Sequence, residues 1–114
     1  MMKKIEAIIT PSEIERVKNA LSKIGICRMK ISHIYGVGSQ KSHREFYRGE
    51  EYLINGAKEI KLELIVSTDE MVRQVVETIK KSAKTEGVGD EEIFVSPIEE
   101  VIRFGKSPYV KCAI

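Results

Sequence analysis

Aromatic and basic side chains gather in one polar stretch of this sequence. Between residues 36 and 59 the chain carries residues of the kinds enriched at binding hot spots, namely Arg44, Phe46, Tyr47, Arg48 and Tyr52. A connection of this length in a compact domain is usually functional or disordered, and disordered segments rarely hold so many aromatics. We therefore expect this loop to contact another protein. The alternative is a long hairpin that packs only on its own aromatic side chains.

Residues that could catalyse a reaction are few. Neither His33 nor His43 has a Ser or Cys partner at a recognisable spacing. Cys27 and Cys112 fit no CxxC motif and no zinc pattern with the two histidines, and we expect both to be reduced thiols, as in a cytosolic protein. The sequence thus predicts no catalytic residue, no metal site and no enzyme.

Length and charge predict a single small domain. The 114 residues are interpreted as one domain, 1–114, and a chain of this size can bury a core without disulfides or metal. The net charge of +2 comes from 19 basic and 17 acidic residues that are interspersed, which argues against nucleic-acid binding. No apolar run approaches the roughly 20 residues of a membrane span, and no signal peptide is recognised, so we expect a cytoplasmic protein.

Hydrophobic periodicity predicts the element order β-α-β-β-α-β, which is the ferredoxin-like α+β arrangement. The expected strands cover residues 3–10, 27–35, 60–66 and 93–95, with a short tail strand beginning at 101–102. The expected helices run from about 12 to 24 and from 72 to 83. Ser12 with Glu15, and Ser67 with Glu70, have the spacing of capping boxes at the helix starts.

One face of this predicted sheet is left without cover. Two helices can cover only one face of a four-stranded sheet, and the other face should carry Ile8, Ile34 and Ile65. An uncovered apolar face usually means association. We therefore expect a homo-oligomer whose sheets pack together inside.

Several segments closely resemble the PII signal-transduction family, the nitrogen regulatory P-II proteins. They are MKKIEAII at residues 2–9, GVGSQK at 36–41, EFYRGEEY at 45–52, a Thr85-x-x-x-Gly89-Asp90-x-x-Ile93-Phe94-Val95 pattern, and VIR at 101–103. The similarity covers nearly the whole chain at nearly constant spacing. The YRGxEY stretch is its most specific part.

The resemblance implies a homotrimer with three nucleotide clefts between neighbouring subunits. In this family a T-loop, here about residues 36–59, inserts into partner proteins, which include nitrogen-assimilation enzymes and ammonium transporters. ATP or ADP, with 2-oxoglutarate joining Mg-ATP, sets the loop's shape. A phosphate-side B-loop falls at about 85–92 and the C-terminal tail at about 101–114. The protein would contact a membrane only through a transporter partner.

The resemblance also implies roles for particular residues. Arg48 matches the loop arginine that enters the ammonium channel, and Tyr52 matches a tyrosine that is uridylylated in some bacteria. The expected partner-binding set is Arg44, Phe46, Tyr47, Arg48 and Tyr52. The expected nucleotide-binding set is Gly38, Gln40, Gly87, Val88, Gly89, Asp90 and Arg103.

The departures from the family fall at its ligand sites. The lysine that usually closes the phosphate-side turn is Glu92, the second arginine of the usual Arg-x-Arg is Gly105, and the T-loop lysine expected to pair with 2-oxoglutarate is Glu59, next to Lys58. Replacing a cation by a carboxylate removes an attraction and adds a repulsion, each about 4 kcal/mol at ~4 Å and an effective dielectric of about 20 before screening.

These changes leave three interpretations of the cleft. It binds a less charged adenine nucleotide, with AMP or ADP favoured over Mg-ATP. Alternatively, Glu91 and Glu92 hold a cation or a cationic ligand, or the cleft is empty and the loop acts constitutively. The Glu59 change argues against 2-oxoglutarate sensing unless Lys58 replaces the missing lysine.

The leading hypothesis is thus a trimeric PII-like regulator that acts on nitrogen metabolism or an ammonium transporter. One rival is a CutA-like metal-tolerance protein, which shares the trimeric ferredoxin-like architecture but would need a cluster of metal ligands that two histidines scarcely supply. Another is a PII-fold regulator of a different transporter, with a rewritten ligand site.

Overall fold

The computed structural model of the chain describes residues 2–37, 45–47, 50–52, 57–83 and 91–105. Within these ranges the order of elements is β1 (Lys3–Ile9), the 3-10 turn η1 (Pro11–Glu13), α1 (Ile14–Lys23), β2 (Lys30–Gly36), β3 (Glu45–Tyr47), β4 (Glu50–Tyr52), β5 (Ala57–Val66), α2 (Asp69–Ser82) and β6 (Glu92–Pro97). Apart from the additional pair β3–β4, this order confirms the ferredoxin-like α+β prediction.

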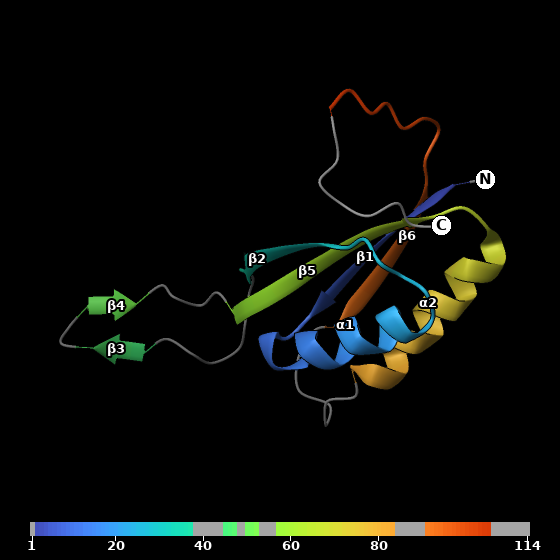
Figure 1. Cartoon of the computed structure of the whole chain (residues 1–114). Coiled ribbons are helices and arrows are strands. Elements are labelled where there is room, and N and C mark those ends of the chain that lie inside the picture. Colours follow the sequence, from blue (N-terminus) through green and yellow to red (C-terminus); the bar gives the residue numbers. More distant parts are fainter. Residues whose placement is uncertain (1, 38–44, 48–49, 53–56, 84–90, 106–114) are drawn as a thin grey trace.

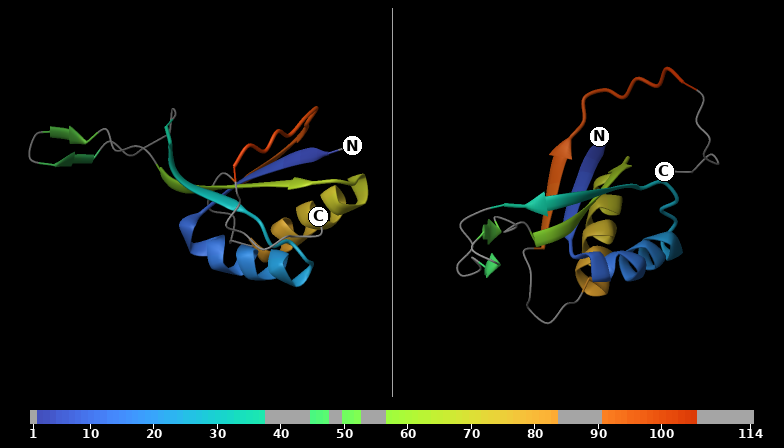
Figure 2. Two further views of the ribbon diagram at one scale, coloured as in Figure 1. Left: turned by 45° about the horizontal axis from the view of Figure 1, so that its top comes forward. Right: turned by 90° about the vertical axis from the view of Figure 1, so that its left-hand side faces the viewer.

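Four of the strands form one antiparallel sheet in the order β2-β5-β1-β6, with β5 and β1 at its centre. Both helices lie against one side of this sheet, and the other side has no helix on it (Figure 1). The two further views in Figure 2 show the same two layers from other directions. The molecule therefore has a helix-covered face and a face that we call the open face.

The hydrophobic core lies between the sheet and the helices. It is built from alternate residues of the central strands, among them Ile5, Ala7 and Ile9 of β1 and Ile60, Leu62, Leu64 and Val66 of β5. Val17 and Leu21 of α1 and Val75 and Ile79 of α2 close it from the other side. Because side chains alternate along a strand, this burial sends Lys4, Glu6, Ile8, Glu59, Lys61, Glu63 and Ile65 to the open face.

The helix starts lie within three residues of the sequence prediction. At the first helix, the Thr10 N–H donates to Glu13 Oε1 at 2.8 Å, so the pair that closes the turn is Thr10 with Glu13 rather than Ser12 with Glu15. At α2 the N-cap is Thr68, whose Oγ1 accepts from the Met71 N–H at 3.1 Å, rather than Ser67. Ser67 and Thr68 have the same capping chemistry, and Thr68, which is extended and directly precedes Asp69, takes the position.

The glycine predicted to end the first helix does so. Gly25 has φ of +97°, a backbone conformation that residues with a Cβ rarely adopt, and the Ile26 N–H returns to the Leu21 carbonyl at 3.0 Å. This turn buries Ile26 in the core and aims the chain toward β2.

Three further expectations are corrected. The second strand starts at Lys30 rather than at 27, and the segment 98–105, expected to begin a tail strand, has no regular structure and arches away from the sheet (Figure 1). Cys27, expected to be a reduced thiol, is disulfide-bonded. The only other cysteine in the sequence, Cys112, lies outside the described residues.

Candidate functional site

The loop that the sequence predicts as a partner-binding T-loop leaves the sheet at one end, where Gly36 of β2 pairs with Ala57 of β5. Within it, β3 and β4 form a two-stranded antiparallel ribbon with Glu45 opposite Tyr52 and Tyr47 opposite Glu50. In Figure 1 this ribbon lies off the end of the four-stranded sheet. Phe46, Tyr47 and Tyr52 therefore sit on strand backbone, whereas Arg44 and Arg48 lie outside the described residues.

The pairing of β2 with β5 decides on which face Lys58 and Glu59 lie. Lys58 is opposite Tyr35 and Glu59 is opposite Ile34, and the buried Ile60 and Leu62 show that even-numbered positions of β5 face the helices. Glu59 thus belongs to the open face, where its carboxylate lies over Gly36. Lys58 belongs to the other face, because neighbouring residues of a strand point to opposite sides. Lys58 is therefore badly placed to substitute for a lysine at position 59.

Most of the predicted phosphate-side turn falls outside the described residues, including Gly87, Val88, Gly89 and Asp90, as do Gly38 and Gln40 at the base of the long loop. The turn's last residue, Glu92, begins β6 and pairs with Ile8 of β1. This register places Glu92 on the open face, the same face as Glu59. Both of the carboxylates that replace family lysines are thus on one side of the sheet.

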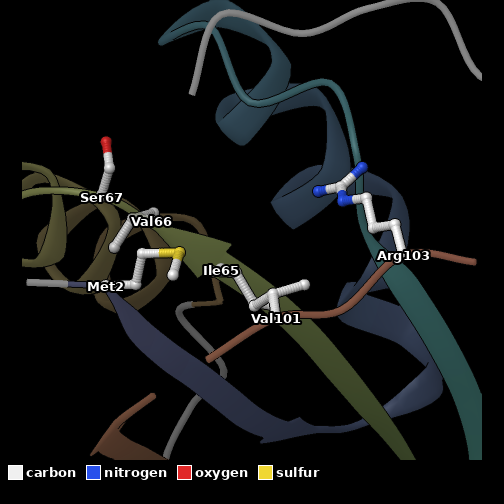
Figure 3. Close-up of a pocket in the computed structure, with 6 residues that line it drawn as sticks. All are labelled: Met2, Ile65, Val66, Ser67, Val101 and Arg103. Atoms are coloured by element: carbon white, nitrogen blue, oxygen red, sulfur yellow. The ribbon is translucent and has the colours of Figure 1, made fainter. Parts of the chain in front are cut away.

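Arg103 is the one residue of the predicted nucleotide-binding set that the described part of the chain contains, and it lines a pocket. The cavity has a volume of about 380 Å³ and is bounded by Met2, Ile65, Val66, Ser67, Val101 and Arg103. Figure 3 shows Met2, Ile65 and Val101 gathered on one side and Arg103 standing on the other. Apolar walls with one guanidinium suit a ligand that combines an apolar part with an anionic group.

This pocket lies at the opposite end of the sheet from the base of the long loop. Val66 pairs with Lys3 at the pocket end, whereas Ala57 pairs with Gly36 at the loop end. At about 3.3 Å per residue, the eight to nine residues of β5 between them span roughly 25–30 Å. A single small ligand cannot touch Arg103 and the loop base of the same chain.

The centre of the open face carries four charges that the sequence reasoning did not single out as a site. Lys4 and Glu6 of β1 with Lys61 and Glu63 of β5, which we call the charge quartet, are linked in a closed ring. Lys4 Nζ lies 3.0 Å from Glu63 Oε2, and Lys61 Nζ lies 3.1 Å from Glu6 Oε2. The signal was present in the sequence as the same Lys-x-Glu spacing in both strands.

The quartet shifts the protonation equilibria of two of its members. The hydrogen bond from Lys4, reinforced by the charges of Lys4, Lys61 and Lys30, holds the pKa of Glu63 below its ordinary value despite partial burial. The hydrogen bond to Glu63 and the charges of Glu63 and Glu6 raise the pKa of Lys4. Each of the two groups is therefore held in its charged form by the fold.

We expect a pH dependence of stability from Glu63. A carboxyl whose pKa is lower in the folded state than in the unfolded state stabilises the fold at pH values above its unfolded-state pKa. This stabilisation is lost as the pH falls through its folded-state pKa. Thermal melts recorded between about pH 6 and pH 3 should show a falling midpoint, with a smaller slope in Glu63→Gln. The raised pKa of Lys4 has the opposite effect. The stability that charged Lys4 contributes is lost as the pH rises above the ordinary pKa of a lysine. A Glu63→Gln curve parallel to that of the unchanged protein would contradict this assignment.

Two absences hold for the described part of the chain. No helix there is long and apolar enough to cross a membrane. No group of three or more histidine, cysteine, aspartate or glutamate side chains is placed there to hold a metal ion.

The sheet, the two helices on one face and the long inserted loop define a small ferredoxin-like α+β protein. A sequence model of the family described as "Nitrogen regulatory protein P-II" matches residues 2–107. The chain belongs to this family. That assignment decides between the two related architectures considered from the sequence, and it favours the P-II proteins over the metal-tolerance class.

Individual relatives agree with the assignment. The chain is 46% identical over 102 residues to the nitrogen regulatory protein P-II of Pasteurella multocida, covering 90% of each chain, and 43% identical over the same length to that of Azospirillum brasilense, again covering 90% of each. Among solved structures, it resembles Arabidopsis thaliana PII bound to citrate with a TM-score of 0.71 and 33% sequence identity, covering 90% of this chain and 81% of that one.

Proposed function

We propose that this chain is a signal-transduction regulator that binds adenine nucleotide in clefts between the subunits of a homotrimer and controls a partner through residues 36–59. The partner is a nitrogen-metabolism enzyme or an ammonium transporter. The protein is not an enzyme, and it acts in the cytoplasm, reaching a membrane only through a transporter.

The separation of the Arg103 pocket from the loop base carries this proposal. A nucleotide that touches both must take Arg103 from one chain and the loop base from another, because β5 spans about 25–30 Å between its pocket end and its loop end within one chain. In such a cleft the apolar residues Ile65 and Val101 suit the base, and Arg103 suits a phosphate. The phosphate-side turn Gly87, Val88, Gly89 and Asp90, with Gly38 and Gln40, would complete the site.

The open-face carboxylates favour a nucleotide with few phosphates. Glu92 and Glu59 each stand where the family's pattern has a lysine, and the register places both on the same face. Each added phosphate brings more negative charge toward these groups, so AMP or ADP should bind better than Mg-ATP. Because Lys58 faces the opposite side of β5, 2-oxoglutarate lacks the cation that would pair with its carboxylates.

The partner-binding role rests on the composition and backbone of the loop. Phe46, Tyr47 and Tyr52 are positions of β3 and β4, and these two strands pair with no other strand of the described chain. Arg44 and Arg48, which lie next to these strands in the sequence, complete the proposed partner-binding set. Tyr52 is the candidate for covalent modification. A nucleotide can control this loop only if it binds one loop conformation better than another.

Isothermal calorimetry with AMP, ADP and Mg-ATP tests the nucleotide proposal. We expect micromolar binding of AMP or ADP, weaker binding of Mg-ATP, and a loss of about tenfold or more in Arg103→Ala. Arg73→Ala removes an exposed arginine of α2 and should change nothing. Glu92→Lys should strengthen Mg-ATP binding more than AMP binding. An absence of heat with all three nucleotides would overturn the nucleotide proposal and leave a loop that acts constitutively.

A second candidate follows from the same two carboxylates. Glu59 and Glu92 stand where the family's pattern has ligand-binding lysines. The second candidate is therefore a regulator of a different transporter, with a rewritten ligand site. Capture of partners from cell extract by the intact protein and by Arg48→Ala separates the two, because an ammonium transporter or a nitrogen enzyme lost with Arg48 supports the first candidate.

A further inference from the structure

An exposed disulfide lies in the connection between α1 and β2. Cys27 belongs to the irregular stretch 26–29, directly after the buried Ile26, and it is disulfide-bonded although the residue is exposed. In the cytoplasm, where we propose that this protein acts, disulfides are usually transient and serve catalysis or redox sensing. Exposed disulfides are also the ones that external thiols reduce most readily. The position of this bond therefore suits regulation rather than permanent reinforcement of the core.

The partner of Cys27 follows from the number of cysteines. The structure contains one chain, and the sequence has one further cysteine, Cys112, in the C-terminal tail. We propose that Cys27 and Cys112 form a reversible disulfide, a redox site that ties the tail to the start of β2 when it is closed and releases the tail when it is reduced.

The segment between the sheet and this tail carries Arg103. At its first residue the Ile98 N–H donates to the Met2 carbonyl at 3.0 Å, and residues 98–105 have no regular structure. Val101 and Arg103 of this segment line the pocket of about 380 Å³. Only residues 106–111 separate the segment from Cys112, so a closed disulfide anchors it at both ends.

Anchoring this segment should favour ligand binding at Arg103. A chain segment that is held at both ends has fewer conformations to lose when its side chains are ordered around a ligand. After reduction the segment is anchored only at Ile98, and the cost of ordering Arg103 rises. The closed form should therefore bind nucleotide more tightly than the open form, a consequence that rests on the proposed nucleotide site.

The redox step is a thiol–disulfide exchange with a low-molecular-weight thiol such as glutathione. A thiolate of the reductant attacks one sulfur of the protein disulfide, forms a mixed disulfide and releases the other cysteine as a thiolate, which takes up a proton. A second thiol molecule then resolves the mixed disulfide. In total the two cysteines gain two electrons and two protons, and two thiol molecules become one disulfide. Closure is the reverse reaction, with that disulfide as the oxidant.

Peptide mapping by mass spectrometry without prior reduction tests the pairing. After incubation of the whole protein with oxidised glutathione, we expect the tryptic peptides 24–28 and 112–114 to be joined, and the chain to run as a monomer on a non-reducing denaturing gel. Two free thiols, or a bond between two chains, would overturn the assignment. A rising share of reduced glutathione should open the bond. A bond that opens only with dithiothreitol is permanent and would overturn the reversible role.

Thermal melts give a readout that needs no ligand. Opening the disulfide removes a constraint on the unfolded chain, so reduction should lower the melting temperature by about 5–15 °C. Cys112→Ser is the matched control, because it cannot form the bond. Its melting temperature should equal that of the reduced protein and should not respond to glutathione. A response in Cys112→Ser equal to that of the unchanged protein would contradict the pairing.

Calorimetry with ADP in the oxidised and reduced states tests the link to Arg103. Reduction should weaken ADP binding about three- to tenfold in the unchanged protein and leave the affinity of Cys112→Ser as it is. A joined peptide pair with the same ADP affinity in both states would overturn the control of Arg103. Absence of ADP binding in both states would overturn the proposed nucleotide function, while the peptide map and the melts still decide the redox site.

Discussion

Replacing Leu62 by alanine should lower the free energy of unfolding by about 2–5 kcal/mol. Leu62 is fully buried at the centre of β5, the strand that pairs with both β1 and β2, and it faces the helices. Truncation removes apolar contact area and leaves a cavity that the surrounding strands and helices fill only in part. Urea unfolding followed by circular dichroism measures the change through the shift in midpoint.

Ile102 supplies the control for this prediction. Ile102→Ala deletes the same number of carbon atoms from an isomeric side chain that is 72% exposed in the irregular segment 98–105. Its stability loss should be within about 0.5 kcal/mol, as for ordinary surface substitutions. Equal losses for the two variants would show that Leu62 does not hold the core position described here, or that Ile102 is buried in an assembly.

Removing the carboxylate of Glu13 should be the most costly change at a polar residue of the described chain. Glu13 is fully buried, and its Oε1 accepts the Thr10 N–H at 2.8 Å where the chain turns from β1 into the first helix. Glu13→Ala leaves that partly buried N–H without its acceptor and opens a cavity at the buried Glu13 position, so we expect a loss of about 1–3 kcal/mol in the free energy of unfolding. The same urea experiment measures it.

Glu13→Gln tests what the second carboxylate oxygen does. Oε2 is buried and has no hydrogen-bond partner in the described structure. Glutamine keeps an oxygen for the Thr10 N–H and removes the charge, so it should be less destabilising than alanine. A glutamine variant as unstable as Glu13→Ala would mean that Oε2 accepts a donor such as a buried water, which an amide N–H₂ would oppose. An alanine variant without any loss would contradict the role given to Glu13.

Helix and strand identity followed from local patterns, but helix starts did not. The spacing of Ile14, Val17 and Leu21 predicted the first helix, and Gly25 predicted its end. The turn before it could have been closed by Thr10 or by Ser12, since both side chains accept hydrogen bonds equally well. The choice depends on where β1 stops pairing with β5, which is a tertiary property.

The side of the sheet on which each loop-flanking residue lies was also beyond local reasoning. The sequence showed Lys58 next to Glu59 and left open whether the lysine could take over the missing role. Pairing with β2 places the two residues on opposite faces, and this placement supports the proposal that Lys58 does not take over that role. A one-residue change of register would have reversed this result without altering the alternation pattern.

The family, the α+β element order and the helix-free face of the sheet were predictable from the sequence, because these depend on residue periodicity and on motifs that are contiguous in the chain. The tertiary structure was needed to see which residues are in contact. It shows the closed ring of Lys4, Glu6, Lys61 and Glu63, the separation of Arg103 from the loop base, and the disulfide of Cys27. The physical reason is that each of these depends on residues far apart in sequence, whose meeting is fixed by strand register and packing rather than by local preference.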